Sequence, residues 1–236
     1  MFRRPTGPLV HRQTIWTRLT HWTWAVALIF LALSGMQILY AHPALYIGQE
    51  SGFGFDNAIA RFEEIPAALR VPSTRDLATG RTIHFFFAWI FVAAGLVWLV
   101  AGLLTRHVWR DVVPKGRDLA ALPRDVADHA RLRLHNARTY SPLQKLSYAA
   151  VLFVLFPGMI VTGLAMSPGF NAVAPWLNDV LGGRQTARTL HFAGLIGLTA
   201  FLAVHLVMVV LAGPLNELRS MVTGWFRIDA EEETTR

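Results

Sequence analysis

The sequence predicts an all-α membrane protein, a four-helix transmembrane bundle with both termini in the cytoplasm. Hydrophobic residues make up 53% of the chain and charged residues 16%, which is typical of an integral membrane protein. Four apolar segments without Lys, Arg, Asp or Glu are each long enough to cross a bilayer. They are residues 19–40, 82–104, 146–166 and 189–212. We expect one membrane domain over residues 1–236.

The distribution of charge predicts the orientation. The N-terminus carries four arginines and no acid before the first segment, and the loop 105–145 carries nine basic against four acidic residues. The loop 41–80 has three basic against five acidic residues. Because basic loops stay in the cytoplasm, the loop 105–145 and the tail 213–236 are expected there, with the loop 41–80 outside. The net charge of +7 then reflects topology, and nucleic acid is not an expected partner.

Each element has its own signal. The first segment is expected to be a retained helix, because it is longer than the apolar part of a signal peptide and no clear cleavage site follows. A short interfacial helix is expected over 57–69 and a polar helix over 124–135. Pro157-Gly158 predicts a kink in the third helix. The acidic run 231–233 is expected to be solvated.

Four histidines are the only His, Lys, Arg, Asp or Glu residues within the apolar segments. They are His21, His84, His191 and His205. Ionisable groups are costly in a bilayer and usually functional there. Three of them follow an arginine by one helical turn; these arginines are Arg18, Arg81 and Arg188. Fourteen residues separate His191 from His205, a helical rise of about 21 Å that leaves both rings on nearly one face.

Membrane depth sorts the histidines into pairs. With the first helix running outward and the second and fourth inward, His21 and His205 fall near the cytoplasmic side. His84 and His191 fall near the outside. Each histidine then has one partner at its own depth on another helix. Two pairs at two depths favour axial ligation of two haem b groups over polar contacts or proton relay.

The absence of cysteine narrows the cofactor. It excludes covalent c-type haem attachment and thiolate-bound iron–sulfur clusters. Two imidazoles fill both axial positions of a haem iron, so such a site exchanges electrons rather than binding oxygen. Zinc is the weaker alternative, because two-histidine sites lack its usual third and fourth ligands. The four histidines are therefore predicted as ligands of haem iron, and no residue is predicted to be catalytic.

The arginines one turn from the histidines are predicted to pair with haem propionates. Arg81 and Arg188 lie on the outside, against the bias of basic residues toward the cytoplasm, and Arg18 has the same spacing to His21. Snorkelling at the interface is the alternative. Gly35, fourteen residues after His21, falls at the depth of the second haem and is predicted to contact it. Ordinary helix packing is the alternative for this glycine.

This histidine spacing resembles the b-type cytochrome subunits of nickel–iron hydrogenases and of membrane-bound formate dehydrogenase. The resemblance covers nearly the whole chain. The outside loop contains His42-Pro43-Ala44-Leu45-Tyr46-Ile47-Gly48 and resembles the thiosulfate reductase cytochrome b branch. The resemblance implies a periplasmic redox subunit, of molybdopterin or hydrogenase type, as partner.

The resemblance also implies a quinone site. In the formate dehydrogenase relative, quinone binds beside the cytoplasmic haem near a Tyr-Asn-x-x-Gln-Lys run. The matching residues here are Tyr140, Ser141, Gln144 and Lys145, with serine in place of the asparagine. A serine offers one hydroxyl where the asparagine has an amide. An ordinary polar helix start is the alternative for Gln144 and Lys145.

The leading functional hypothesis is a di-haem electron conduit in the bacterial cytoplasmic (inner) membrane. It would connect the periplasmic partner to the quinone pool, with quinone or quinol as substrate and membrane lipid around it. A self-contained oxidoreductase, acting on a small diffusible molecule at the outer haem, is the alternative. A haem-free transporter or scaffold whose histidines relay protons is a third possibility. The ligands do not encode the direction of electron flow.

Overall fold

The computed structural model describes residues 6–52, 56–133 and 139–230. Parts of both long loops and the predicted solvated run 231–233 lie outside the described residues. The contacts within the chain group it into two compact units, each described by itself below. Unit 1 is Met1–Trp22, Gly95–Val154 and Thr199–Arg236, and unit 2 is Thr23–Ala94 and Leu155–Leu198. The single domain expected over 1–236 stays a prediction.

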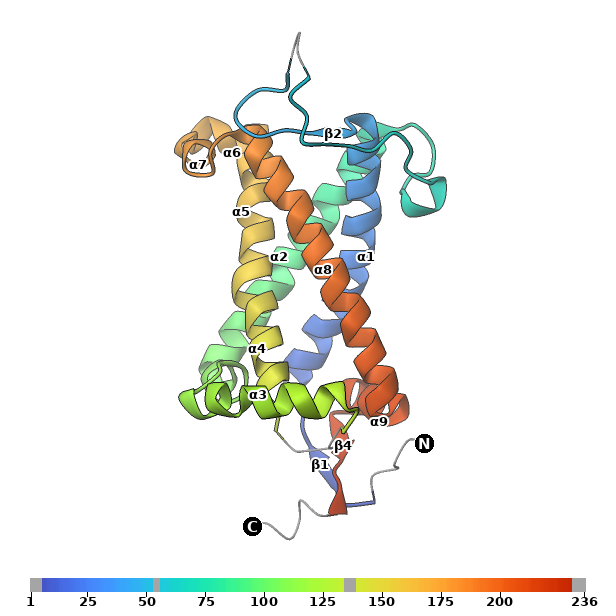
Figure 1. Cartoon of the computed structure of the whole chain (residues 1–236), viewed down its shortest axis with the longest axis vertical. Helices are drawn as coiled ribbons and strands as arrows, with labels where there is room; N and C mark the ends of the chain where they lie inside the picture. The colour runs from blue at the N-terminus through green and yellow to red at the C-terminus, as the bar shows by residue number, and fades with distance from the viewer. Residues whose placement is uncertain (1–5, 53–55, 134–138, 231–236) are drawn as a thin grey trace. The chain divides into compact units, whose positions relative to one another are not determined.

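Within the described residues, four helices are long and apolar enough to cross a membrane, which confirms the predicted fold class (Figure 1). They are α1 (Ile15–Ala41), α2 (Leu77–Leu104), the helical run Pro142–Met166 and α8 (Arg184–Ala212). Each begins four or five residues before its predicted apolar segment. Helical hydrogen bonding continues through the polar first turns, which hydropathy does not detect.

The third span is not one regular helix. α4 (Pro142–Ala150) passes into a five-residue π-helical turn, η3 (Val151–Leu155), and α5 (Phe156–Met166) follows. Proline lacks an amide N–H and its ring crowds the preceding turn, so a wider turn before Pro157 accommodates it. The kink predicted at Pro157-Gly158 stays a prediction, and the π-helical turn lies just before these residues.

The two ends of the described chain meet in unit 1. β1 (Leu9–His11) pairs antiparallel with β4 (Trp225–Arg227), so that Leu9 lies opposite Arg227. α9 (Pro214–Thr223) precedes β4. The predicted tail is therefore folded as far as it is described. The strand pairing also puts both ends on one side of a membrane, and the cytoplasmic side stays a prediction.

The loop after α2 has more helix than expected. It contains the π-helical turn η2 (Val108–Val112) and then α3 (Gly116–Ala130). The predicted bounds 124–135 are wrong: the Asp118 carboxylate accepts the Lys115 N–H at 2.9 Å, which starts the helix early, and the chain leaves it at Arg131. Residues 134 and 135 lie outside the described residues.

The loop between α1 and α2, in unit 2, is extended where a helix is predicted. β2 (Ala44–Leu45) pairs with β3 (Ala60–Arg61), and a single 3-10 turn, η1 (Ala67–Leu69), follows. The helix predicted over 57–69 is wrong, because the segment is held by strand pairing and by Ile65, which packs against Leu39 and Leu45. Two short helices, α6 (Pro168–Val173) and α7 (Trp176–Val180), lie between α5 and α8.

Candidate functional site

His84 on α2 and His191 on α8 face each other in unit 2. Their ring centroids are 6.2 Å apart and the ring planes are inclined by 62°. The His84 Nδ1 atom lies 3.0 Å from the Ser34 hydroxyl, and the His191 Nδ1 atom lies 2.9 Å from the Thr162 hydroxyl. Ser34 and Thr162 are both buried, at 0% and 6% exposure. The structure thus brings together two histidines that the sequence predicts as a pair.

The hydroxyls fix the tautomers of these two rings. Ser34 donates its proton to the Phe30 carbonyl, and Thr162 donates to the Gly158 carbonyl, each at 2.6 Å. A hydroxyl has one proton to give, so each oxygen accepts the Nδ1–H of its histidine. The lone pair of each ring is then on Nε2, as a metal-binding neutral imidazole requires.

A glycine follows each of these hydroxyl residues. A Cβ atom at Gly35 would lie 3.4 Å from the His84 Cε1 atom, and one at Gly163 would lie 3.4 Å from the His191 Cε1 atom. The structure therefore places Gly35 against a predicted ligand, while its contact with a haem stays a prediction. Sequence reasoning did not single out Ser34 or Thr162, and for Gly163 it predicted only ordinary helix packing. The signal in the sequence that could have identified them is a hydroxyl residue followed by glycine, which occurs in two of the apolar segments as Ser34-Gly35 and Thr162-Gly163.

His21 on α1 and His205 on α8 form the second pair, in unit 1. Their ring centroids are 6.3 Å apart and the planes are inclined by 55°. The His205 ring stacks on Phe201 at 5.7 Å. The His21 Nδ1 atom is buried, and within the described residues it has no hydrogen-bond partner. This pair therefore has the same spacing as the first but a different environment.

Both pairs fit a metalloporphyrin. Two imidazoles that bind one metal ion from opposite sides, with metal–nitrogen bonds of about 2 Å, hold their centroids roughly 6.3 Å apart. Both observed separations, 6.2 and 6.3 Å, match this value. In the described part of the chain, no three His, Cys, Asp or Glu side chains gather into a metal site. Two imidazoles suit an ion whose other ligands come from a porphyrin.

The three arginines predicted to bind propionates have contacts within the protein. Arg18 donates to the Val222 carbonyl at 2.6 Å in unit 1. In unit 2, Arg188 donates to the carbonyls of His42 and Ala44, the latter at 2.9 Å, and so fixes the start of the loop between α1 and α2. Arg81 is exposed and lies 5.7 Å from the Phe85 ring. Their pairing with propionates stays a prediction.

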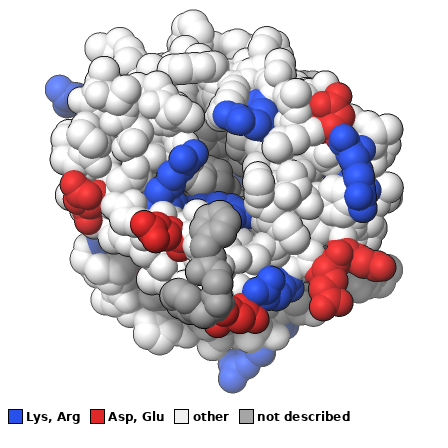
Figure 2. All heavy atoms as spheres, turned by 90° about the horizontal axis from the view of Figure 1, so that it is seen from above, with Lys and Arg blue, Asp and Glu red and all other residues white. Residues whose placement is uncertain are grey.

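Basic side chains also mark the end of the molecule that carries β2. Figure 2 views this end and shows Lys and Arg side chains around a hollow near its middle, with Asp and Glu side chains mostly farther out. Positive charge at the edge of a hollow suits carboxylate or other anionic groups.

The predicted quinone residues lie together in unit 1, and each of them has a structural partner. Ser141 caps α4 in a reciprocal bond with Gln144 and also donates to Asp125 at 2.8 Å. Lys145 is buried in an ion pair with Asp118 at 3.0 Å. The Lys115 N–H and the Lys145 ammonium keep the pKa of Asp118 below its usual value. A quinone role for Ser141, Gln144 and Lys145, and for Tyr140, stays a prediction.

Tyr140 has a different environment. Its hydroxyl donates to the Gln13 amide oxygen at 3.0 Å and accepts from the Gln13 amide nitrogen at 2.8 Å, and burial raises its pKa. The Arg12 guanidinium lies 5.0 Å from the Tyr140 ring centroid. Burial also raises the pKa of Glu217 on α9, against the charge of Arg12. Sequence reasoning missed Gln13, because its partner is far away in the chain.

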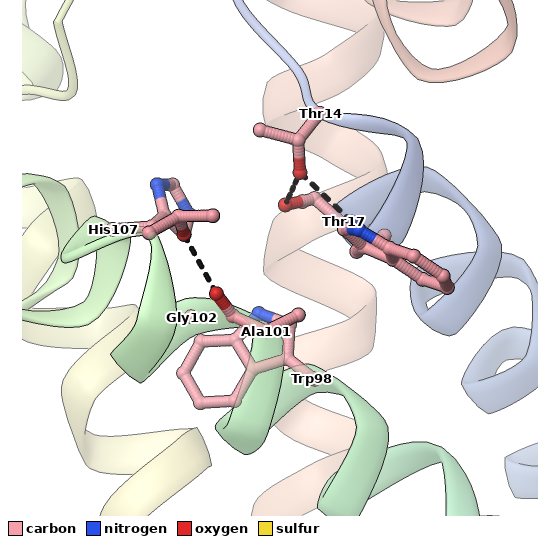
Figure 3. Close-up of a pocket in the computed structure, with 8 residues that line it drawn as sticks. Thr14, Thr17, Trp98, Ala101, Gly102 and His107 are labelled. Atoms are coloured by element: carbon pink, nitrogen blue, oxygen red, sulfur yellow. Dashed lines mark hydrogen bonds between the residues drawn. The ribbon is translucent and has the colours of Figure 1, made fainter.

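A small pocket in unit 1 lies between the first turn of α1 and the end of α2 (Figure 3). Thr14 and Thr17 point toward each other on one wall, with hydroxyls 3.0 Å apart, and Trp98 lies on the other. His107 at its edge bonds Asp111 through Nδ1 at 2.8 Å. Thr14, Thr17 and His107 thus have partners within the protein, and none of the residues that line the pocket is a predicted site residue.

Apolar spanning helices that carry two facing imidazole pairs define a membrane protein of the haem-binding, electron-transferring class. The chain belongs to the family described as prokaryotic cytochrome b561, whose model matches residues 12–224. It is therefore a multi-pass membrane cytochrome that binds haem b. The predicted resemblance is confirmed at the level of this family, and the narrower thiosulfate reductase branch stays a prediction.

Two relatives illustrate the family. A putative protein-methionine-sulfoxide reductase subunit, YedZ1, of Azospira oryzae is 29% identical over 200 residues, which is 83% of this chain and 88% of that protein. A probable Ni/Fe-hydrogenase B-type cytochrome subunit of Cupriavidus necator is 26% identical over 233 residues, 88% of this chain and 83% of that protein. Both names describe subunits rather than free-standing enzymes.

Proposed function

We propose that the chain holds two haem b groups and passes electrons between a periplasmic redox subunit and the quinone pool of the bacterial cytoplasmic membrane. His84 and His191 would hold one haem, and His21 and His205 the other. The observation that carries this proposal is the centroid separation of 6.2 and 6.3 Å in the two pairs. The four histidines come from three helices and form two pairs, both with this spacing.

The residues of the chain would perform three tasks. The paired imidazoles would hold the haem iron, and the haem would supply one-electron exchange. The apolar helices would enclose the porphyrin and exclude water. The hydroxyls of Ser34 and Thr162 hold the tautomer of the unit 2 ligands.

Aromatic contacts support a quinone site near Tyr140. The Tyr140 and Tyr148 ring centroids are 5.3 Å apart, those of Tyr148 and Phe201 are 6.5 Å apart, and Phe201 stacks on His205. Quinone reduction takes two electrons and two protons, and the reverse reaction releases them. Half-buried Glu217, whose pKa is raised, is suited to exchange such protons.

The relatives support a redox partner. One is named as a reductase subunit and the other as a hydrogenase subunit, so a periplasmic subunit of molybdopterin or hydrogenase type is the proposed partner. Recovery of a redox subunit with the tagged protein from native membranes is the expected result. Recovery of the cytochrome alone, with full turnover of a small diffusible substrate, would favour the self-contained oxidoreductase.

Haem stoichiometry tests the proposal directly. We expect the purified protein to give a reduced-minus-oxidised b-type spectrum with two haems per chain. His205→Ala should leave one haem, the one between His84 and His191. His129→Ala is the matched control, because His129 bonds the Asp125 carbonyl at 2.8 Å and should keep both haems. Two haems in His205→Ala would contradict the pairing, and a wild-type protein without a b-type spectrum would favour a haem-free role.

A further inference from the structure

Two buried hydroxyls in unit 2 have no part in helix capping or in the apolar core. Ser34 and Thr162 each bond their own helix at the carbonyl four residues earlier, and each contacts a histidine of another helix. A hydroxyl can meet its need for a hydrogen bond by donating to a carbonyl of its own helix, and this requires no imidazole nearby. The same arrangement occurs twice, from residues distant in sequence.

A second acceptor reinforces the arrangement. The backbone of Leu31 also hydrogen-bonds His84, and the backbone of Met159 also hydrogen-bonds His191. Each of these residues lies three positions before the hydroxyl residue. A carbonyl can only accept, which agrees with a proton on Nδ1 of each ring. Each imidazole therefore faces a hydroxyl oxygen and a main-chain carbonyl on one rigid helical turn.

The glycines limit where the rings can lie. The Cε1 atoms of His84 and His191 each lie 3.4 Å from the position of a Cβ at Gly35 and Gly163. The Cε1 edge of each ring thus packs against the backbone at a glycine, and Nδ1 hydrogen-bonds the residue before that glycine. Position and rotation of each ring are both determined by one dipeptide of a neighbouring helix.

We propose that Ser34 and Thr162 are positioning residues that set the reduction potential of the haem held by His84 and His191, and leave the other haem unaffected. This inference rests on the proposed function. An acceptor at Nδ1–H gives the imidazole more anionic character, which stabilises ferric over ferrous iron and lowers the potential. In unit 1, the His21 Nδ1 atom has no such partner within the described residues.

Thr162 offers a clean pair of variants. Thr162→Val keeps the shape of the side chain but removes the hydroxyl, and Thr162→Ser keeps the hydroxyl but removes a methyl group. Thr20→Ala is the matched control, since the Thr20 hydroxyl is also buried and bonds the Trp16 carbonyl of its own helix at 2.8 Å. Ser34→Ala tests the second hydroxyl.

The experiment is a potentiometric titration of each purified variant, with haem content and low-temperature electron paramagnetic resonance of the oxidised form. In Thr162→Val and Ser34→Ala, one of two haem components should shift to higher potential, with a changed low-spin signal, while the other component stays in place. Thr162→Ser should match the wild type, and Thr20→Ala should leave the shifting component unchanged. Loss of only that haem from Thr162→Val would also support the proposal.

Unchanged potentials and signals in Thr162→Val at full haem content would overturn this inference while leaving the two-haem proposal intact. An equal shift of both components, or a shift in Thr162→Ser as large as in Thr162→Val, would also overturn it. Two outcomes concern the proposed function instead: a wild-type protein with a single haem, and one with none.

Discussion

The two histidine pairs have nearly the same ring separation but are supported by different parts of the protein. In unit 2, the supports of His84 and His191 are inside the spanning helices: a hydroxyl and a glycine on α1 and another such pair on α5. In unit 1, the neighbourhood of His21 is built by segments outside the spans. Arg18 and Trp22 bond the carbonyls of Val222 and Met221 at the end of α9.

This difference shows two ways to hold an imidazole in an apolar bundle. Supports within the helices are short and local, so they fix the ring itself. Supports from the end of α9 fix α1, the helix that carries His21. We therefore expect the unit 2 pair to be sensitive to single atoms near the ring, and the unit 1 pair to be sensitive to the stability of the surrounding segments.

The largest expected effect on haem content comes from replacing a glycine that packs against a histidine of unit 2. Gly163→Leu places a side chain against His191, whose Cε1 atom is already 3.4 Å from a Cβ at this position, and should displace the ring. Haem content should fall from two to one per chain. Gly158→Leu is the control on the same helix, because a Cβ there meets nothing within 4 Å. Equal haem content in both variants would remove the proposed difference between the units.

A smaller effect is expected from the ion pair that holds α3 in unit 1. Lys145→Met leaves Asp118 without its ammonium partner and should reduce the stability by about 1.5–3 kcal/mol, the range for charged hydrogen bonds. Thermal unfolding in detergent measures this loss. Arg124→Met is the control, since Arg124 is 91% exposed and lies 4.0 Å from Asp128. Unchanged stability together with lost quinone reduction would instead favour the quinone role of Lys145.

The smallest effect is a pH-dependent one at Glu217. Burial raises the pKa of this carboxyl group in the folded protein, so its stabilising contribution is complete below the unfolded pKa of about 4.3 and is lost as the pH rises through the folded pKa. Glu217→Gln should therefore raise the melting temperature slightly near pH 8, with no difference at about pH 4. A lower melting temperature near pH 8 would mean that Arg12 more than compensates for burial.

The spanning helices and the histidine pairing follow from the sequence because hydropathy and charge are local signals. Uncharged apolar segments with one or two histidines are visible in any window of the chain. The partners of Ser34 and Thr162 were not visible, because a hydroxyl within an apolar helix usually bonds its own backbone and needs no other role. Asp118 was likewise not expected to meet Lys145, since a turn and a poorly predicted helix boundary separate them.

The folded ends were missed for a related reason. The strands β1 and β4 are three residues each and pair across almost the whole chain. Neither strand has enough alternation to be recognised alone. The bounds of α3 were wrong because its start depends on one capping carboxylate, Asp118, rather than on the apolar pattern.

The pairing of β1 with β4 has a practical consequence for topology mapping. Because Leu9 and Arg227 are opposite each other in a two-stranded ladder, a reporter fused to either end of the chain samples the same compartment. A reporter fused after a truncation at Ala212 would lack β4 and α9, and with them the carbonyls that Arg18 and Trp22 bond. A fusion that keeps residues up to 230 is therefore the one that reports on the native arrangement of the first helix.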